Sequence, residues 1–317
     1  MSNSLLSTLI YKQAERYGNN VVLKYRDYEA GQWLPISWKQ FAEKVKLASN
    51  ALVALGVGAQ ENVGVFSQNM PECLYTDFGA FGCRIVTIPL YATSSEAQVT
   101  YIVEDASIRV LFVGEQYQYD VALRVLGLCN SLKQIVIFDP KVKRAPSDTQ
   151  SIYYDEFLKL GADGKNQQEV DKRTQESSPD DLANILYTSG TTGESKGVML
   201  RHSCYEAAFW GHNQLFEKLG PNDVVMNFLP YSHIFERAWT YWCLSRGCQL
   251  AVNLCPQDIQ KTIKEIRPTA MCSVPRFWEK VYAGVLEKIN ETTGLKKNLM
   301  LNALKVGKEH NLSLIHI

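Results

Sequence analysis

Short apolar runs alternate along the chain with longer segments in which apolar residues recur at helical spacing. The runs at 62–66, 110–113 and 134–138 are rich in Val, Ile and Phe, which favours buried strands. The segment that follows Ser37 instead places its apolar positions on one broad face and predicts a helix. Alternation of short strands with longer helices predicts an α/β fold with mostly parallel sheets.

Two of the predicted helices begin with a capping box, in which Ser37 precedes Gln40 and Ser95 precedes Gln98. The same pattern predicts further helices at 5–17, 71–81, 120–129, 204–219, 234–245, 258–266, 276–290 and 295–310. It predicts further strands at 21–25, 84–90, 182–187, 197–200, 224–229, 249–253 and 270–274.

One polar stretch interrupts this alternation and predicts the domain organisation. Residues 161–181 are almost free of large apolar side chains and predict a surface linker. A first α/β lobe is then expected at 1–160, and a second lobe is expected to begin at 182 and extend to 311. Residues 312–317 resemble the translated end of a common sequencing adapter, so we interpret them as an artefact. The alternative is a genuine terminal strand.

Composition excludes several classes of protein. The chain has 317 residues, of which 46% are hydrophobic, and its 33 basic and 33 acidic side chains balance. Without a basic block, a nucleic-acid partner is not expected. The eight cysteines form no Cys-x-x-Cys pair and mostly lie in apolar runs, so we expect reduced thiols and no metal site.

No segment of the sequence predicts secretion or a membrane span. The N-terminus lacks a basic region followed by an apolar one. The most apolar stretch, 78–92, is interrupted by Arg84 and Pro89. We therefore expect a cytoplasmic protein, with peripheral association at the inner membrane face left open.

A stretch made largely of Gly, Ser and Thr lies between the predicted strands 182–187 and 197–200. Small residues let backbone N–H groups approach a ligand closely, and consecutive N–H groups in such a loop form an anion-binding concavity. The residues predicted to bind phosphate are Thr188, Ser189, Gly190, Thr191, Thr192, Gly193 and Lys196. The natural ligand of this loop is a polyphosphate.

The spacing of this loop differs from that of the Walker A loop, in which Gly-Lys is followed by Ser or Thr and a helix. Here Lys196 stands between Ser195 and Gly197, and the residues after it predict a strand. A P-loop NTPase is therefore disfavoured. The structural alternative is a hairpin turn of small residues with a solvated lysine.

A second group of polar residues follows the predicted strand 224–229. His233 lies where this strand gives way to the helix 234–245. Ligands of open α/β sheets bind at the carboxyl ends of the strands, so this position suits a binding residue. The alternative is a capping segment in which Ser232 caps the helix and His233 has no function.

The loop sequence Tyr-Thr-Ser-Gly-Thr-Thr-Gly-x-x-Lys-Gly at 187–197 resembles the phosphate loop of the adenylate-forming superfamily. His-Ile-Phe-Glu-Arg at 233–237 resembles the second core motif of the long-chain fatty acyl-CoA synthetases, and 274–280 resembles a third segment of that branch. Residues 84–92 and 94–106 are similar to the N-terminal lobe. The resemblance covers residues 1–311 and implies the large N-terminal domain of that fold, with two α/β subdomains.

The resemblance implies a chemistry and assigns roles to residues. A fatty acid reacts with ATP and Mg²⁺ to give an acyl-adenylate and pyrophosphate, and the acyl group then passes to CoA. Catalysis of such a step is mainly positioning and electrostatic stabilisation. The resemblance places the loop on the β- and γ-phosphates, with Lys196 as a counter-charge and His233 beside the carboxylate. Phe235 and Trp239 would gate the acyl channel, although an aromatic stripe at helical spacing is more often core.

The remaining motifs of the family do not occur in the sequence. It contains no Tyr-Gly-x-Thr-Glu segment, no Thr-Gly-Asp segment for the ribose and no C-terminal lid with its lysine. The main Mg²⁺ ligand is expected downstream of these residues, so we expect the chain alone to be inactive. Two alternatives stay open: a ligase for an aryl or amino acid, and a truncated, non-catalytic nucleotide-binding fragment.

Overall fold

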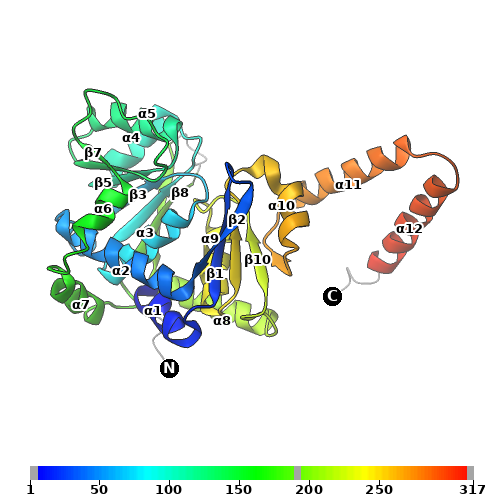
Figure 1. The fold of residues 1–317 in the computed structure, drawn as a ribbon, viewed down its shortest axis with the longest axis horizontal. Helices are drawn as coiled ribbons and strands as arrows, with labels where there is room; N and C mark the ends of the chain where they lie inside the picture. Colours follow the sequence, from blue (N-terminus) through cyan, green and yellow to red (C-terminus); the bar gives the residue numbers. More distant parts are fainter. Residues whose placement is uncertain (1–5, 189–193, 313–317) are drawn as a thin grey trace. The chain divides into compact units, whose positions relative to one another are not determined.

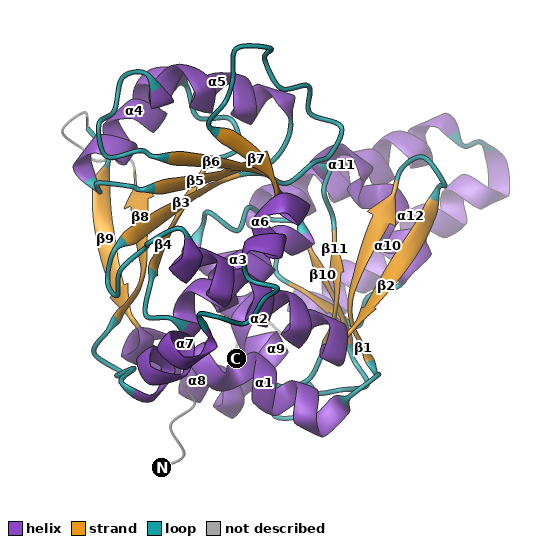
Figure 2. Cartoon of the chain, turned by 60° about the vertical axis from the view of Figure 1, so that its left-hand side comes forward, coloured by secondary structure: helices purple, strands orange, loops and turns teal. Residues whose placement is uncertain are grey.

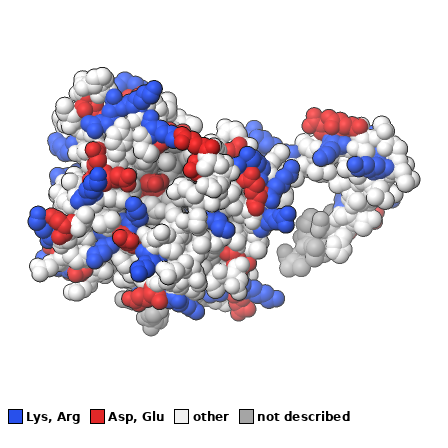
Figure 3. Space-filling view, viewed as in Figure 1, with Lys and Arg blue, Asp and Glu red and all other residues white. Residues whose placement is uncertain are grey.

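The structure is a computed structural model that describes residues 6–188 and 194–312. Its contacts divide the chain into two compact units, residues 1–272 and 273–317. Figure 1 shows the first unit as two sheets with helices around them. Basic and acidic side chains are interspersed on the face shown in Figure 3. Among the helices of the described residues, none combines the length and apolar character that a bilayer crossing requires.

The larger sheet has seven strands in the order β7-β6-β5-β3-β4-β8-β9. Neighbouring strands are parallel except for the antiparallel hairpin of β8 and β9. The bounds are β3 Asn62–Phe66, β4 Val86–Leu90, β5 Val110–Val113, β6 Gln134–Ile137, β7 Ser151–Tyr153, β8 Leu182–Thr188 and β9 Lys196–Arg201.

The central strands of this sheet are buried on both faces, which explains their continuous apolar runs. Val110 and Phe112 of β5 pack into the cluster on the side of α2 (Trp38–Ala54), α3 (Pro71–Gly82) and α6 (Tyr154–Leu160). Leu111 and Val113 belong to a second cluster with residues of α4 (Glu96–Asp105) and α5 (Gln116–Leu126). Figure 2 shows these two helices on one face of the larger sheet. Each fully buried side chain of this kind contributes about 1.5–3 kcal/mol.

The smaller sheet has five strands in the order β12-β10-β11-β1-β2, and only β1 and β2 are antiparallel. Its strands are β1 Val21–Asp27, β2 Gln32–Ser37, β10 Val224–Asn227, β11 Gln249–Val252 and β12 Ala270–Met271. The accompanying helices are α1 Leu6–Tyr17, α8 His202–Leu215, α9 Ile234–Ser245 and α10 Ile259–Ile266, with the short η1 Pro256–Asp258.

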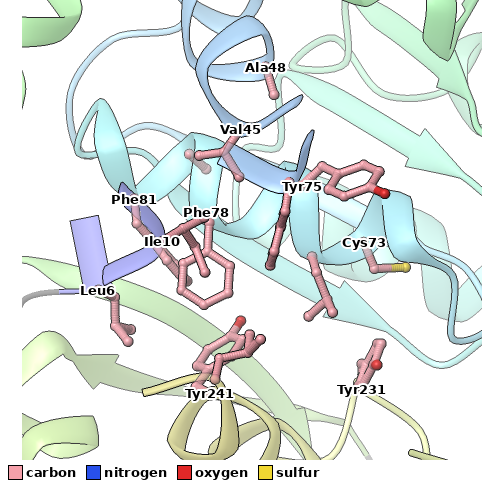
Figure 4. Close-up of a cluster of buried hydrophobic side chains, with 14 of the residues drawn as sticks. Leu6, Ile10, Val45, Ala48, Cys73, Tyr75, Phe78, Phe81, Tyr231 and Tyr241 are labelled. Carbon is pink, nitrogen blue, oxygen red and sulfur yellow. The ribbon is translucent and has the colours of Figure 1, made fainter. Parts of the chain in front are cut away.

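The two sheets share one hydrophobic core where α1, α2, α3 and α9 meet (Figure 4). Phe78 of α3 lies 5.1 Å from Tyr241 of α9, and Phe81 lies 5.8 Å from the same ring. Both are tilted edge contacts, the arrangement that aromatic rings favour. This core fixes α9 against α3, so the residues at the start of α9 have a defined place relative to the larger sheet.

The second unit consists of two helices, α11 Pro275–Glu291 and α12 Gly294–Leu312. Pro275 stands at the first turn of α11, where its missing N–H costs nothing. Residues 313–317 lie outside the described residues, so the interpretation of 312–317 as an artefact stays a prediction.

The structure differs from the domain organisation expected from the sequence. Strands β1 and β2 join the sheet of β10 and β11, whereas β8 and β9 join the larger sheet. The expected linker 161–181 contains the helix α7 (Gln167–Gln175), in which Val170 is buried. This helix has one apolar anchor, and its polar side chains bind neighbouring helices, as in the 3.0 Å bond between Asn50 and Gln167. An apolar pattern alone does not detect such a helix.

Candidate functional site

The predicted phosphate loop connects β8 to β9. Thr188 ends β8, Lys196 begins β9, and the two residues face each other across the hairpin. Both side chains are exposed, so a hydroxyl and an ammonium group are accessible at the mouth of the loop. Five of the predicted phosphate-binding residues, Ser189, Gly190, Thr191, Thr192 and Gly193, lie outside the described residues and stay predictions.

Two hydrogen bonds connect the hairpin that carries this loop to helix α4. The Tyr187 hydroxyl donates a 2.5 Å hydrogen bond to Asp105 of α4, and the Tyr101 hydroxyl donates to the Ser195 carbonyl at 3.0 Å. Tyr187 faces Gly197, where a Cβ atom would stand 2.8 Å from Ile185 and 3.2 Å from the Tyr187 ring. Glycine is therefore required here by close packing, and the loop begins and ends on fixed strands.

His233 is the N-cap residue of α9, and its side chain is exposed. Its Nδ1 atom accepts a 3.2 Å hydrogen bond from the Phe235 N–H. Because Nδ1 is the acceptor, the neutral ring carries its proton on Nε2 and can donate it to an anion. The helix N-terminus adds a partial positive charge at this position. Ser232, the cap expected in the structural alternative, is buried and is not the N-cap.

The hairpin and His233 follow strands whose carboxyl ends meet. Strands β3, β4 and β8 are parallel, so Thr188 lies at the same edge of the larger sheet as Asn69, which follows β3. The Asn69 side chain bonds to Leu229 and Tyr231, which follow β10 in the smaller sheet. Asn69 therefore connects the edge of the larger sheet where Thr188 lies with the segment that leads to His233, and ligands of parallel sheets bind at such an edge.

The acidic and basic residues of the His-Ile-Phe-Glu-Arg motif are buried and hold α9 in place. Glu236 accepts a 2.6 Å hydrogen bond from Asn227 of β10. Arg237 forms a 2.7 Å ion pair with Asp77 of α3, and the side chains of both residues are 1% exposed. Both side chains are therefore inaccessible to a ligand. Of the polar side chains in this motif, His233 is the exposed one.

Burial of Glu236 makes the stability of the fold depend on pH. Removal from water raises the pKa of its carboxyl to about 8. The unfolded value is about 4.3, so between these values the native state holds one more proton than the unfolded state. Stability should therefore fall as pH rises through this window, by up to about 1.4 kcal/mol per pH unit.

We predict that Glu236→Gln removes this contribution, because glutamine keeps the acceptor for Asn227 and cannot ionise. Denaturant unfolding at intervals across the window measures the slope for both proteins. Glu96→Gln, at an exposed ion pair with Arg124, is the control and should keep the slope of the unmodified protein. Equal slopes for Glu236→Gln and the unmodified protein would contradict this assignment.

The two aromatic residues predicted to gate an acyl channel lie in different surroundings. Phe235 is 48% exposed, whereas Trp239 is 7% exposed. Trp239 lies on α9 and packs against the end of α8, with its ring centroid 5.4 Å from that of Phe216 and 5.2 Å from that of Trp242. This packing accounts for Trp239 as a core residue, and the gate stays a prediction for both.

A cavity of about 440 Å³ lies at the same edge of the sheets, lined in part by Asn69. Six carboxylate side chains and two basic ones line it: Asp27, Glu29, Glu72, Glu115, Asp139 and Asp155, with Arg26 and Lys141. Burial raises the pKa of Glu72 to about 7. The excess of carboxylates disfavours a polyphosphate or a fatty carboxylate in this cavity, so the hairpin and His233 fit these anions better.

Among the described residues, no group of three or more His, Cys, Asp or Glu side chains is arranged to hold a metal ion. Lys196 and Thr188 fit phosphate oxygens, which are anionic acceptors, rather than a cation. Residues 6–188 and 194–312 therefore show no Mg²⁺ site of their own.

Known proteins resemble this chain along most of its length. The family described as AMP-binding enzyme matches residues 10–310. Fatty acyl-CoA synthetase A of Dictyostelium discoideum is 33% identical over 281 residues, which cover 86% of this chain and 41% of that protein. A long-chain-fatty-acid–CoA ligase of Xenopus laevis is 29% identical over 312 residues, 96% of this chain and 41% of that protein. The chain thus spans less than half the length of these relatives.

The fold is shared with solved adenylate-forming structures. The adenylation domain of a carboxylate reductase from Mycobacterium chelonae superposes with a TM-score of 0.75 at 21% identity, covering 96% of this chain and 52% of that one. The fold class predicted from the sequence, the α/β large domain of the adenylate-forming enzymes, is confirmed.

Proposed function

The chain belongs to the AMP-binding enzyme family, and from this premise we propose that it carries the phosphate- and carboxylate-binding part of a long-chain fatty acid–CoA ligase. Such a ligase activates a fatty acid with ATP to an acyl-adenylate and then forms the thioester with CoA. The observation that carries the proposal is the exposed His233 at the start of α9, in a segment that Asn69 bonds to the sheet edge where the β8–β9 hairpin lies.

The hairpin residues would bind the nucleotide phosphates. The Thr188 hydroxyl can donate to a phosphate oxygen, and the Lys196 ammonium group offsets its charge. Both stand at the mouth of a loop whose Tyr187 and Ser195 flanks are fixed to α4. A fixed base keeps the donors close to the phosphates without an entropic cost at the moment of binding.

His233 would bind the carboxylate that is activated. In the first step a carboxylate approaches an α-phosphate, and the two groups repel each other. An Nε2–H donor and the N-terminus of α9 both favour negative charge at this point. His233 would orient the carboxylate for attack. It would then donate to an oxygen of the acyl phosphate group that forms. Mg²⁺ bound to ATP would neutralise phosphate charge. The residues of this chain would bind the nucleotide phosphates and the fatty carboxylate.

Binding and turnover are expected to differ in this chain. The sequence contains no Tyr-Gly-x-Thr-Glu motif and no lid lysine, the family's adenine and catalytic elements. We therefore expect the 317-residue chain to bind ATP and an acyl-adenylate mimic without catalysing ATP–pyrophosphate exchange. A palmitoyl mimic that binds more tightly than a benzoyl one would favour the fatty acid over an aryl substrate.

Replacing Lys196 with alanine tests the nucleotide site. A charged hydrogen bond contributes about 1.5–3 kcal/mol, so Lys196→Ala should weaken ATP binding at least about tenfold. Titration calorimetry with ATP and Mg²⁺ measures the dissociation constant. Lys218→Ala, at another exposed lysine, is the matched control and should bind as the unmodified chain does. Equal affinities for Lys196→Ala and the control would remove Lys196 from the site.

A further inference from the structure

The segment between β10 and α9 is bonded on one side by a single asparagine. The Asn69 side chain donates from Nδ2 to the Leu229 carbonyl at 2.8 Å. Its Oδ1 atom accepts from the Tyr231 N–H at 3.0 Å. Asn69 is 6% exposed, so water does not compete for either bond. One amide group therefore occupies a donor and an acceptor of this segment, as a neighbouring strand would.

The other side of the same segment is bonded by Arg237. Its Nε atom donates to the Tyr231 carbonyl at 2.7 Å, and its Nη1 atom is paired with Asp77 of α3. Tyr231 is buried, facing the side chains of α3 in Figure 4. Both the N–H and the carbonyl of Tyr231 are thus held by buried side chains. The following turn closes with a 3.0 Å bond from the His233 N–H to the Pro230 carbonyl.

We propose that Asn69 is a positioning residue for His233, acting through the backbone of residues 229–231. This inference rests on the proposed function, in which His233 binds the reacting carboxylate. Two peptide units separate Tyr231 from His233, and the turn between them is fixed, so the place of Tyr231 sets the place of the imidazole. An amide side chain supplies a donor and an acceptor in one plane, whereas alanine supplies neither and an ionised aspartate only accepts.

Hydrogen exchange of two amides separates this role from a local structural one. The Tyr231 amide is bonded directly to Asn69, whereas the Phe235 amide is bonded to the His233 ring. If Asn69 positions His233, Asn69→Ala accelerates exchange at both amides by about three- to tenfold, the equivalent of one hydrogen bond. Acceleration at Tyr231 with unchanged exchange at Phe235 would overturn the proposal.

Asn253→Ala is the matched control for this experiment. Asn253 is 3% exposed and donates to the Cys255 carbonyl at 2.8 Å, so it also holds the segment after a strand. Within the described part of the chain, its side chain bonds to Cys255 and Thr262 rather than to residues 229–233, so we expect its removal to leave Phe235 exchange unchanged. Asn69→Asp keeps the acceptor for Tyr231 and should give an intermediate effect. Rapid exchange at Phe235 in the Asn253→Ala chain would assign the effect to lost stability and would also overturn the proposal.

A double-mutant cycle links this positioning to ligand binding. The probe is palmitoyl-sulfamoyl adenosine, a stable mimic of the acyl-adenylate. We expect His233→Ala to weaken its binding by about ten- to hundredfold when Asn69 is present and by less than about threefold in the Asn69→Ala chain. Equal losses in both backgrounds would overturn the proposal. No loss in either background would instead refute the proposed role of His233, and the exchange data would still decide whether Asn69 holds the segment.

Discussion

Replacing Arg237 with methionine is expected to lower the free energy of unfolding by about 3–5 kcal/mol. The change leaves the Asp77 carboxylate buried without its ion-pair partner, and both side chains are 1% exposed in the native protein. It also removes the donor to the Tyr231 carbonyl. Denaturant unfolding followed by circular dichroism measures the loss.

Two companion variants test the cause of this loss. Asp77→Leu combined with Arg237→Met removes both charges, so it should recover much of the stability. Recovery is expected although Tyr241 loses its acceptor on Asp77, because a neutral unpaired hydroxyl costs less than a buried charge. Arg124→Ala, at an ion pair that is about half exposed, should cost no more than about 1 kcal/mol. A loss for Arg237→Met as small as that of Arg124→Ala would contradict the account of this pair.

Replacing His233 with alanine is expected to weaken binding of the palmitoyl-adenylate mimic by about ten- to hundredfold, while ATP binding stays within about twofold. The imidazole contributes one hydrogen bond to an anionic group, worth about 1.5–3 kcal/mol, and contributes nothing to the hairpin. Because the side chain is exposed, folding should be almost unaffected. His310→Ala, a histidine of α12 in the other unit, is the control. An equal loss for ATP and for the mimic would show that His233 acts on the fold rather than on the carboxylate.

Local rules predicted much of the fold from the sequence. Both capping boxes form, with Ser37 and Ser95 each accepting from the backbone three residues on. The helix 234–245 and the β8–β9 hairpin are confirmed. Each was predicted from the spacing of its own apolar residues and from the residues at its ends. Strand β10 ends at Asn227 rather than at 229, because the Leu229 carbonyl bonds to Asn69 instead of a neighbouring strand.

Elements that depend on distant partners were not predicted. Strand β2 contains Pro35, which disfavours a strand in the middle of a sheet, but β2 is an edge strand. Helix α7 has a single buried apolar residue and is stabilised through side chains such as Thr174, which donates to the Gly82 carbonyl. Partners that lie so far away in sequence leave no periodic signal.

The residues of the candidate site also fall into those that the sequence indicated and those that it missed. The sequence indicated His233 and the hairpin because small residues and a strand–helix junction are local signals. It could not show that Glu236 and Arg237 are buried, because their partners Asn227 and Asp77 lie on other elements. Asn69 was missed for the same reason. Its position just before a proline-initiated helix, at the end of a buried strand, is the signal that could have identified it.

The most direct test of the central claim maps where the palmitoyl-adenylate mimic binds, by amide chemical shifts of the isotope-labelled chain. We predict that the affected amides lie at the β8–β9 hairpin, around Thr188 and Lys196, and at the start of α9, around His233. Affected amides confined to the acidic cavity, around Tyr28 and Lys141, would contradict it, as would no binding at all.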